Sequence, residues 1–137
     1  MNRRLKIVCI ISASVLFSLA LTYGAVRFVM TYMDNQYTSL HEGCAPRQKN
    51  HLLTVQNNVV TPSNIVADRC DTLTVKNMDT VNRMMAFGVH EKHVAYDGIE
   101  EKELSTGQSY TVTLVQKGSF KIHDHMDEEV GATFQVK

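Results

Sequence analysis

Hydrophobic residues form one unbroken run near the N-terminus and alternate with polar residues in the second half of the chain. The run IVCIISASVLFSLALTYGAV, residues 7–26, contains no charged residue. As an α-helix rising about 1.5 Å per residue it would be about 30 Å long, the thickness of the hydrocarbon core of a bilayer. The pattern predicts an N-terminal transmembrane helix within residues 1–33, followed by a helix extension and linker over residues 34–50.

From His51 onward the hydrophobic period is that of β-strands. Short apolar runs are separated by turn residues, and none has a convincing helical period. Such spacing is typical of an all-β sandwich or barrel, which we place at residues 51–137. The segment DEEVG, residues 127–131, is interpreted as a turn. The expected strands are HLLTVQ (51–56), DTLTVKN (71–77), NRMMAFGV (82–89), SYTVTLVQ (109–116), GSFKIHD (118–124) and ATFQVK (132–137).

The charge pattern gives the N-terminal helix a direction. The segment MNRRLK is basic and contains no acidic residue, which predicts a single-pass protein of the cell membrane with its N-terminus inside and its C-terminal domain extracytoplasmic. A cleaved signal peptide is the alternative, with weak cleavage sites at residues 18–20 and 22–24, and it would make the domain a secreted protein. Basic and acidic residues balance at 14 each, so no nucleic-acid partner is expected.

The three cysteines fit an exported domain. Cys9 lies inside the apolar run, whereas Cys44 and Cys70 lie outside it. Disulfides persist in extracytoplasmic compartments, and a Cys44–Cys70 bridge would close a loop of roughly 26 residues, contributing about 3 kcal/mol. The alternatives are two free thiols, or metal ligation by one of them.

The order of residues in VVTPSNIVADRCDTLTVKNMD, residues 59–79, resembles the first half of a cupredoxin domain. That family typically shows an apolar residue, a proline, an apolar residue, Gly-Asp, a strand and Asn-x-Asp. This chain has Val60, Pro62, Ile65, Cys70-Asp71, Leu73 with Val75, and Asn77-Met78-Asp79, with Cys70 in place of the glycine.

The segments ELSTGQSYTVTLVQKGSFKIHD and GATFQV resemble the closing half of the same family. Leu104 and Gly107 match its Leu-x-x-Gly turn, and Gly118 and Phe120 precede the position of its metal loop. The resemblance covers residues 51–137 and implies a Greek-key cupredoxin-like β-sandwich behind the membrane helix.

The ligands of a blue-copper cupredoxin such as plastocyanin are missing from their expected positions. The resemblance places the first histidine of that family near Asn82 or Arg83. It places the cysteine at Asp124 and the later histidine near Asp127. A blue site needs a thiolate with two imidazoles, so the resemblance implies the fold without an ordinary blue-copper electron carrier.

Two histidine pairs offer a different set of ligands. His90 and His93 are three residues apart, which suits a turn. His123 and His125 lie two apart on an expected strand and therefore point to the same side. The pairs resemble a divergent, histidine-rich branch of cupredoxin-like proteins. A site of three or four imidazoles without sulfur favours Cu²⁺ first and Zn²⁺ second.

The surroundings of the second pair bear on this hypothesis. Asp124 and Asp127 are expected to accept ring N–H groups behind the metal ligands, and Met126 is a soft sulfur ligand for Cu⁺. If Ile122 faces the core, His123 faces outward, so the site is expected at a flank or rim of the sandwich. Only a turn of the chain near Gly88 would bring the two pairs together.

Other polar groups are given structural interpretations. The histidines outside the two pairs, His41 and His51, are interpreted as solvated. The run GIEEKE, residues 98–103, is interpreted as a solvated edge, Tyr96 as a buried tyrosine, and Met84 and Met85 as core residues.

Three functions follow from these observations. The first is a membrane-tethered, extracytoplasmic copper-binding protein that captures or transfers copper, with a copper-donor or redox partner protein and electron transfer as a further use. The second is a metal-free binding or assembly module on the same fold. The third, a small copper enzyme, is disfavoured because nothing resembles a substrate pocket or a general base. No phosphate loop or hydrolase elbow is found either, and the protein is expected not to be an enzyme.

Overall fold

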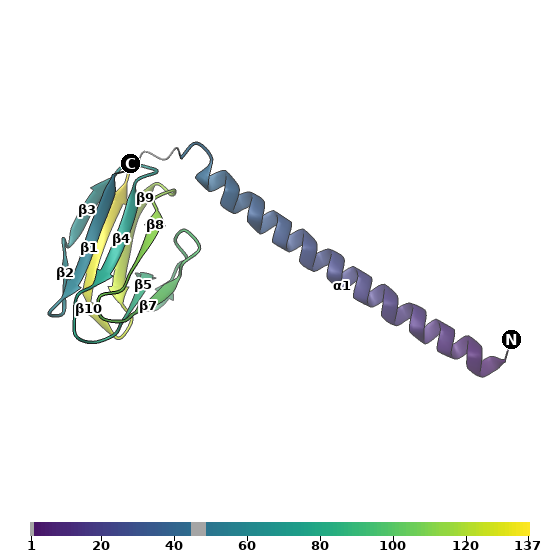
Figure 1. Cartoon of the computed structure of the whole chain (residues 1–137). Helices are drawn as coiled ribbons and strands as arrows, with labels where there is room; N and C mark the ends of the chain where they lie inside the picture. Colours follow the sequence, from purple (N-terminus) through teal and green to yellow (C-terminus); the bar gives the residue numbers. More distant parts are fainter. Residues whose placement is uncertain (1, 45–48) are drawn as a thin grey trace. The chain divides into compact units, whose positions relative to one another are not determined.

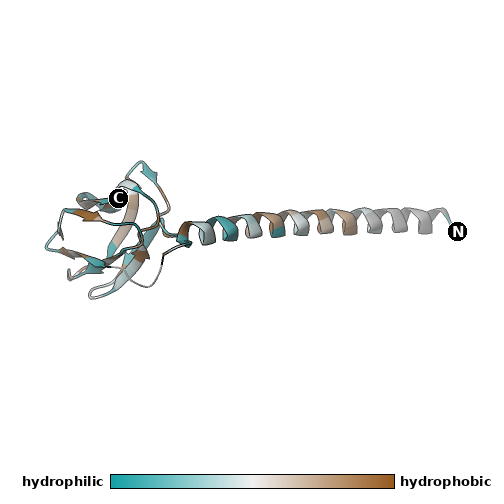
Figure 2. Ribbon diagram, turned by 90° about the horizontal axis from the view of Figure 1, so that it is seen from above, coloured by the Kyte–Doolittle hydropathy of each residue, from teal (hydrophilic) through white to brown (hydrophobic). Residues whose placement is uncertain are grey.

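The computed structural model describes residues 2–44 and 49–137, with side chains placed for residues 2, 12, 14–44 and 49–137. The chain divides into two units, Met1–Ser39 and Leu40–Lys137. Helix α1 spans Arg3–His41 (Figure 1). Its stretch Ser14–His41 is long and apolar enough to cross a membrane, which suits a membrane anchor and a signal sequence alike. In the coloured part of α1, the hydrophilic turns lie toward its C-terminal end (Figure 2).

The second unit is a sandwich of two β-sheets (Figure 1). One sheet has the strand order β2-β1-β4-β8, and the other has the order β3-β10-β9-β5-β6 with β7 paired to β5. Strand β1 runs parallel to β4 and β3 runs parallel to β10. The strands are β1 (Asn50–Gln56), β2 (Val59–Thr61), β3 (Asn64–Ala67), β4 (Thr72–Asn77), β5 (Arg83–Val89), β6 (Lys92–His93), β7 (Glu101–Leu104), β8 (Ser109–Thr113), β9 (Gly118–Asp124) and β10 (Asp127–Val136).

The all-β prediction is confirmed, and each of the six expected strands corresponds to a strand of the structure. The interpretation of DEEVG as a turn is wrong, because β10 already begins at Asp127 and only a register shift separates Asp127 from Gly131. The strands β2, β3, β6 and β7 were not predicted. Each has between two and four residues, too few for an alternating pattern to stand out.

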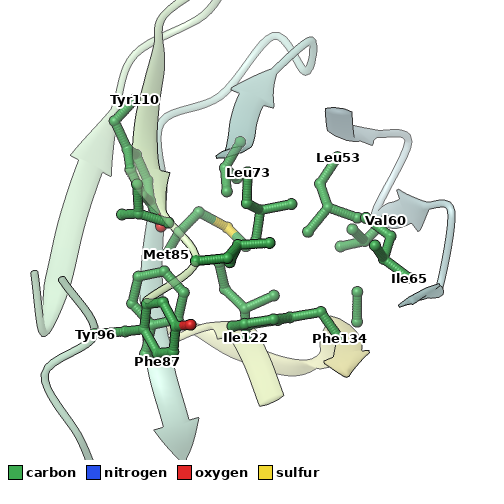
Figure 3. Packing of buried hydrophobic residues seen from close by; sticks show 14 of the residues in the cluster. Leu53, Val60, Ile65, Leu73, Met85, Phe87, Tyr96, Tyr110, Ile122 and Phe134 are labelled. Atoms are coloured by element: carbon green, nitrogen blue, oxygen red, sulfur yellow. The ribbon is translucent and has the colours of Figure 1, made fainter. Parts of the chain in front are cut away.

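Alternate residues of both sheets fill the hydrophobic core (Figure 3). Leu73 of β4, Ile122 of β9 and Phe134 of β10 are almost completely buried, and each such side chain contributes about 1.5–3 kcal/mol. The ring of Phe87 lies 5.5 Å from that of Tyr96. Tyr96 is buried, as expected, and its hydroxyl donates to the Gln116 carbonyl at 3.1 Å.

A disulfide joins Cys44 to Cys70, as predicted. Cys70 has a φ of 75°, a left-handed conformation that favours glycine, and it occupies the position where the family resemblance has a glycine. The neighbouring Arg69 donates from Nη2 to the carbonyls of Leu40 at 2.8 Å and Glu42 at 3.2 Å. The disulfide and these hydrogen bonds tie residues 40–44 to the turn at residues 69–70, which precedes β4.

Candidate metal centre

One row of residues crosses the second sheet on the face opposite to the core, and it consists of Glu101, Ala86, His123 and Gly131. Ile122 points into the core, so the next residue of β9 points to the other face. His123 is paired with Ala86 of β5 and with Gly131 of β10. Ala86 is in turn paired with Glu101 of β7. Directly paired residues share a face of the sheet, so the side chains of this row lie next to one another.

Small residues in and beside this row allow the chain to pack closely there. A Cβ at Gly131 would lie 2.8 Å from the Ile122 carbonyl oxygen and 3.2 Å from the His123 Cβ. At Gly88, where φ is +100°, a Cβ would lie 2.5 Å from the Lys92 carbonyl oxygen. Only glycine therefore permits the close approach of β5 and β6.

The β5–β6 hairpin brings the first histidine pair to the second. Gly88 pairs with His93 and Val89 with Lys92, so the chain turns back where the sequence hypothesis required it. His123 points away from the core, as expected. The expectation of an open flank is nevertheless wrong for His123, which is 0% exposed, because the histidines of the hairpin lie against it.

The four histidine rings form one cluster. The ring centroid of His93 lies 4.9 Å from that of His125 and 5.3 Å from that of His123. The centroid of His90 lies 5.1 Å from that of His125 and 6.0 Å from that of His123. Four imidazoles that bind one metal at about 2.0–2.1 Å have centroids roughly 4.5–6.5 Å apart. The ring spacing falls in this range, although only His93 and His125 of the four have ring nitrogens that belong to a described ligand group.

A carboxylate joins the cluster from β7. Ligand atoms of His93, Glu101 and His125 all lie within 4.8 Å of one another. Among the described residues, these three form the group whose ligand atoms lie that close together. His90 and His123 lie next to the group, with ring contacts to His125 and His93 respectively. The interpretation of GIEEKE as a solvated edge therefore missed Glu101. Its pairing with Ala86 is a long-range contact that the local sequence does not reveal.

His123 is buried without a hydrogen-bond partner. Neither Nδ1 nor Nε2 of its ring meets hydrogen-bond geometry with a described residue, although buried polar atoms are ordinarily paired. Burial lowers the pKa of the imidazole, the charge of protonated His93 lowers it further, and the Gly88 backbone opposes these effects. A neutral imidazole with free nitrogens is the form that binds a metal.

The remaining residues near the loop are more exposed. Met126 is 81% exposed, and the exposed Asp127 accepts the backbone N–H of Glu129 at 3.3 Å. Their roles beside a metal stay predictions. Met85 is a core residue as expected, whereas Met84 is only half-buried.

The two other histidines are paired with carboxylates, so the interpretation of both as solvated is wrong. Nε2 of His51 lies 2.7 Å from Oδ2 of Asp71, because β1 and β4 run side by side. Nε2 of His41 lies 2.8 Å from Oδ1 of Asp97. Neither histidine belongs to the cluster.

Solved structures with similar folds include several copper-protein structures. No protein-family model matches the chain, and no curated protein matches it. A purple cupredoxin from Nitrosopumilus maritimus superposes with a TM-score of 0.56 at 17% identity, over 63% of this chain and 98% of that one. A reduced Cu(I) form of an amicyanin mutant at pH 4 gives 0.55 at 13% identity, over 69% and 89%. An oxidized amicyanin mutant gives 0.54 at 13% identity, over 63% and 80%.

The domain has the cupredoxin fold. The family resemblance of the sequence predicted this fold correctly. The identities of 13–17% extend the similarity no further than the fold.

Two expected ligand positions of the cupredoxin domain hold an ion pair instead. Nη1 of Arg83 lies 2.9 Å from Oδ2 of Asp124, and both side chains are buried. Arg83 also donates to Oδ2 of Asp79 from Nε at 3.0 Å and from Nη2 at 2.6 Å. The carboxylate of Asp124 is thus engaged by Arg83 and by the N–H groups of Met84 and Met126, and its predicted role behind a histidine stays a prediction.

Proposed function

We propose that this domain binds one copper ion with His90, His93, His123 and His125, and that it captures or transfers copper outside the cell membrane. The observation that carries the proposal is the convergence of the two histidine pairs around the unpartnered nitrogens of His123. The cupredoxin fold supports copper over other metals, since the similar amicyanin structure is described as a Cu(I) form.

The donor set decides the character of the site. Both cysteines of the described domain are used in the Cys44–Cys70 disulfide, so no thiolate is at hand among its described residues. Imidazole ligands suit Cu²⁺, and a site without thiolate lacks the intense colour of a blue-copper centre. Bound copper would supply one-electron exchange, and the histidines would hold and orient it.

The helix supplies the proposed tether. Its apolar stretch is long enough for a single crossing, and the basic residues before it favour an N-terminus inside the cell. The domain would then face the extracytoplasmic space, where the Cys44–Cys70 disulfide persists. There it could exchange copper with a donor or redox partner protein.

Copper titration of the purified full chain in detergent tests the proposal. Wild type should bind one Cu²⁺ per chain. The His93→Ala/His125→Ala variant should lose that stoichiometric binding. His51→Gln is the matched control, because it removes a histidine outside the cluster while keeping an N–H donor for Asp71. Unchanged copper stoichiometry in the double variant would contradict the proposal.

The Arg83–Asp124 ion pair favours a second candidate, a metal-free binding or assembly module. An internal cation already neutralises the carboxylate at the position that the family resemblance gives to the copper cysteine. In that case neither Cu²⁺ nor Zn²⁺ would raise the melting temperature of the chain, and wild type would take up no stoichiometric metal in the titration.

A further inference from the structure

The two ring nitrogens of His93 face different partners. Nε2 lies 3.2 Å from Nδ1 of His125, and Nδ1 lies 3.6 Å from Oε2 of Glu101. Two nitrogens that bind one metal at about 2.0–2.1 Å are roughly 2.8–3.4 Å apart. The first distance therefore fits a pair of metal-binding atoms. The second places the carboxylate beside the other nitrogen of the same ring, with an oxygen that also lies within 4.8 Å of a ligand nitrogen of His125.

We infer that Glu101 is a positioning residue for His93 and that its charge makes the site prefer Cu²⁺ to Cu⁺. This inference rests on the proposed copper site. If the proton of His93 is on Nδ1, the nitrogen nearer Glu101, then Nε2, which now makes a 3.2 Å hydrogen-bond contact with Nδ1 of His125, is the nitrogen that would bind the metal. A carboxylate behind a metal-bound imidazole fixes its tautomer and orientation and strengthens it as a ligand.

The position of Glu101 follows from the sheet. Its pairing partner on β5 is Ala86, whose small side chain separates it from His123 in the same row. The Glu101 side chain is 47% exposed, against 11% for His93. A carboxylate that is half exposed loses little solvation, so Glu101 can lie beside the cluster without a buried partner.

The charge gives the site a preference between the two oxidation states. The attraction between a carboxylate and a cation scales with the charge of the cation, so Glu101 stabilises Cu²⁺ about twice as strongly as Cu⁺. Oxygen donors near the metal act in the same direction, since they suit harder ions. A residue that only supported the fold would affect both ions equally.

Glu103 provides a matched control on the same strand. It lies two residues further along β7, so it projects to the same face of the sheet. Its Oε1 accepts a hydrogen bond from Nδ2 of Asn82 at 3.0 Å. Glu103 has the same side chain as Glu101, and its described hydrogen bond is to Asn82 and not to a histidine.

The experiment measures the Cu²⁺ and Cu⁺ affinities of the full chain by competition with chelators of known affinity. Glu101→Gln should lower Cu²⁺ affinity about 10- to 100-fold and Cu⁺ affinity only about 3- to 10-fold, the square root of the Cu²⁺ loss. Each tenfold difference between the two ions raises the reduction potential by about 59 mV. Glu101→Asp should keep the preference for Cu²⁺, and Glu103→Gln should match wild type.

Two results would overturn the inference. One is an equal loss of both affinities in Glu101→Gln, which is the effect of a structural residue. The other is no loss of either, while the His93→Ala/His125→Ala variant still abolishes binding, and that result leaves the copper site standing. If the double histidine variant keeps its copper, the proposed function fails and the inference fails with it.

Discussion

The guanidinium group of Arg83 lies 2.9 Å from the carboxylate of Asp124 in the interior of the domain. This contact ties the start of β5 to the end of β9. Asp124 is the residue between His123 and His125 in the sequence. The second oxygen of Asp124 accepts the N–H groups of Met84 and Met126. The loop that carries two of the proposed ligands is therefore held by the protein itself.

Removal of Arg83 should destabilise the domain severely. Arg83→Met would leave the buried carboxylates of Asp79 and Asp124 without their cation, and breaking a buried pair in this way costs about 3–5 kcal/mol. Urea unfolding of the full chain measures the loss. Arg83→Lys keeps the charge but not the planar guanidinium group, so its stability should lie between those of the wild type and Arg83→Met. A loss below about 1 kcal/mol for Arg83→Met would be typical of an exposed pair and would contradict this assignment.

The same network predicts how stability depends on pH. Burial by itself would raise the pKa of Asp79, but the N–H of Asn57 and the guanidinium of Arg83 hold it below its ordinary value of 3.8. The unfolded chain therefore binds a proton at a higher pH than the folded one. This part of the stability is present above pH 3.8 and is lost as the pH falls through the folded pKa.

The measurement for this prediction is the free energy of unfolding as a function of pH on the acid side. Wild type should lose stability steeply below pH 3.8. Asp79→Asn should be less stable at neutral pH and should show a shallower acid slope, because the titrating group is gone. Identical slopes in the two proteins would show that Asp79 does not contribute in this way.

Gly88 should be required for the histidine cluster. Gly88→Ala places a Cβ 2.5 Å from the backbone oxygen of Lys92, which forces the hairpin open and moves His93. Gly107→Ala is the control, because Gly107 also has a positive φ, of +80°, but no atom lies within 4 Å of its added Cβ. Both variants should lose about 1–2 kcal/mol from the backbone conformation.

Copper affinity separates these two glycine variants. Gly88→Ala should bind Cu²⁺ at least about tenfold more weakly, the scale of a disturbed ligand orientation, whereas Gly107→Ala should bind as wild type. Equal copper affinities in the two variants would show that the β5–β6 turn does not position the ligands.

Local sequence patterns were sufficient for the strands that carry the core. Leu73 and Val75 alternate with threonines. Because adjacent residues of a strand point to opposite faces, the inward Ile122 correctly placed His123 on the face opposite to the core. The covering of His123 could not be predicted, since it depends on where the β5–β6 hairpin lies after folding. Glu101 was missed for the same reason: in sequence it belongs to a charged run, and only its pairing with Ala86 brings it to the cluster.

Pairing between distant strands also explains the misinterpreted His51. Its partner Asp71 is 20 residues away in sequence, and the parallel alignment of β1 with β4 creates the contact. Cys70 illustrates the opposite case. The sequence comparison had marked its position as a glycine position, and the positive φ of the cysteine shows that the backbone conformation is retained.

The electron paramagnetic resonance spectrum of the full chain with one equivalent of Cu²⁺ tests the central claim most directly. Nitrogen couplings count the imidazoles on the metal. We predict a single Cu²⁺ species with couplings to several imidazoles in wild type, retained in His51→Gln and lost in His93→Ala/His125→Ala. A wild-type spectrum without imidazole couplings, or one that the double variant leaves unchanged, would contradict a copper site built from the two histidine pairs.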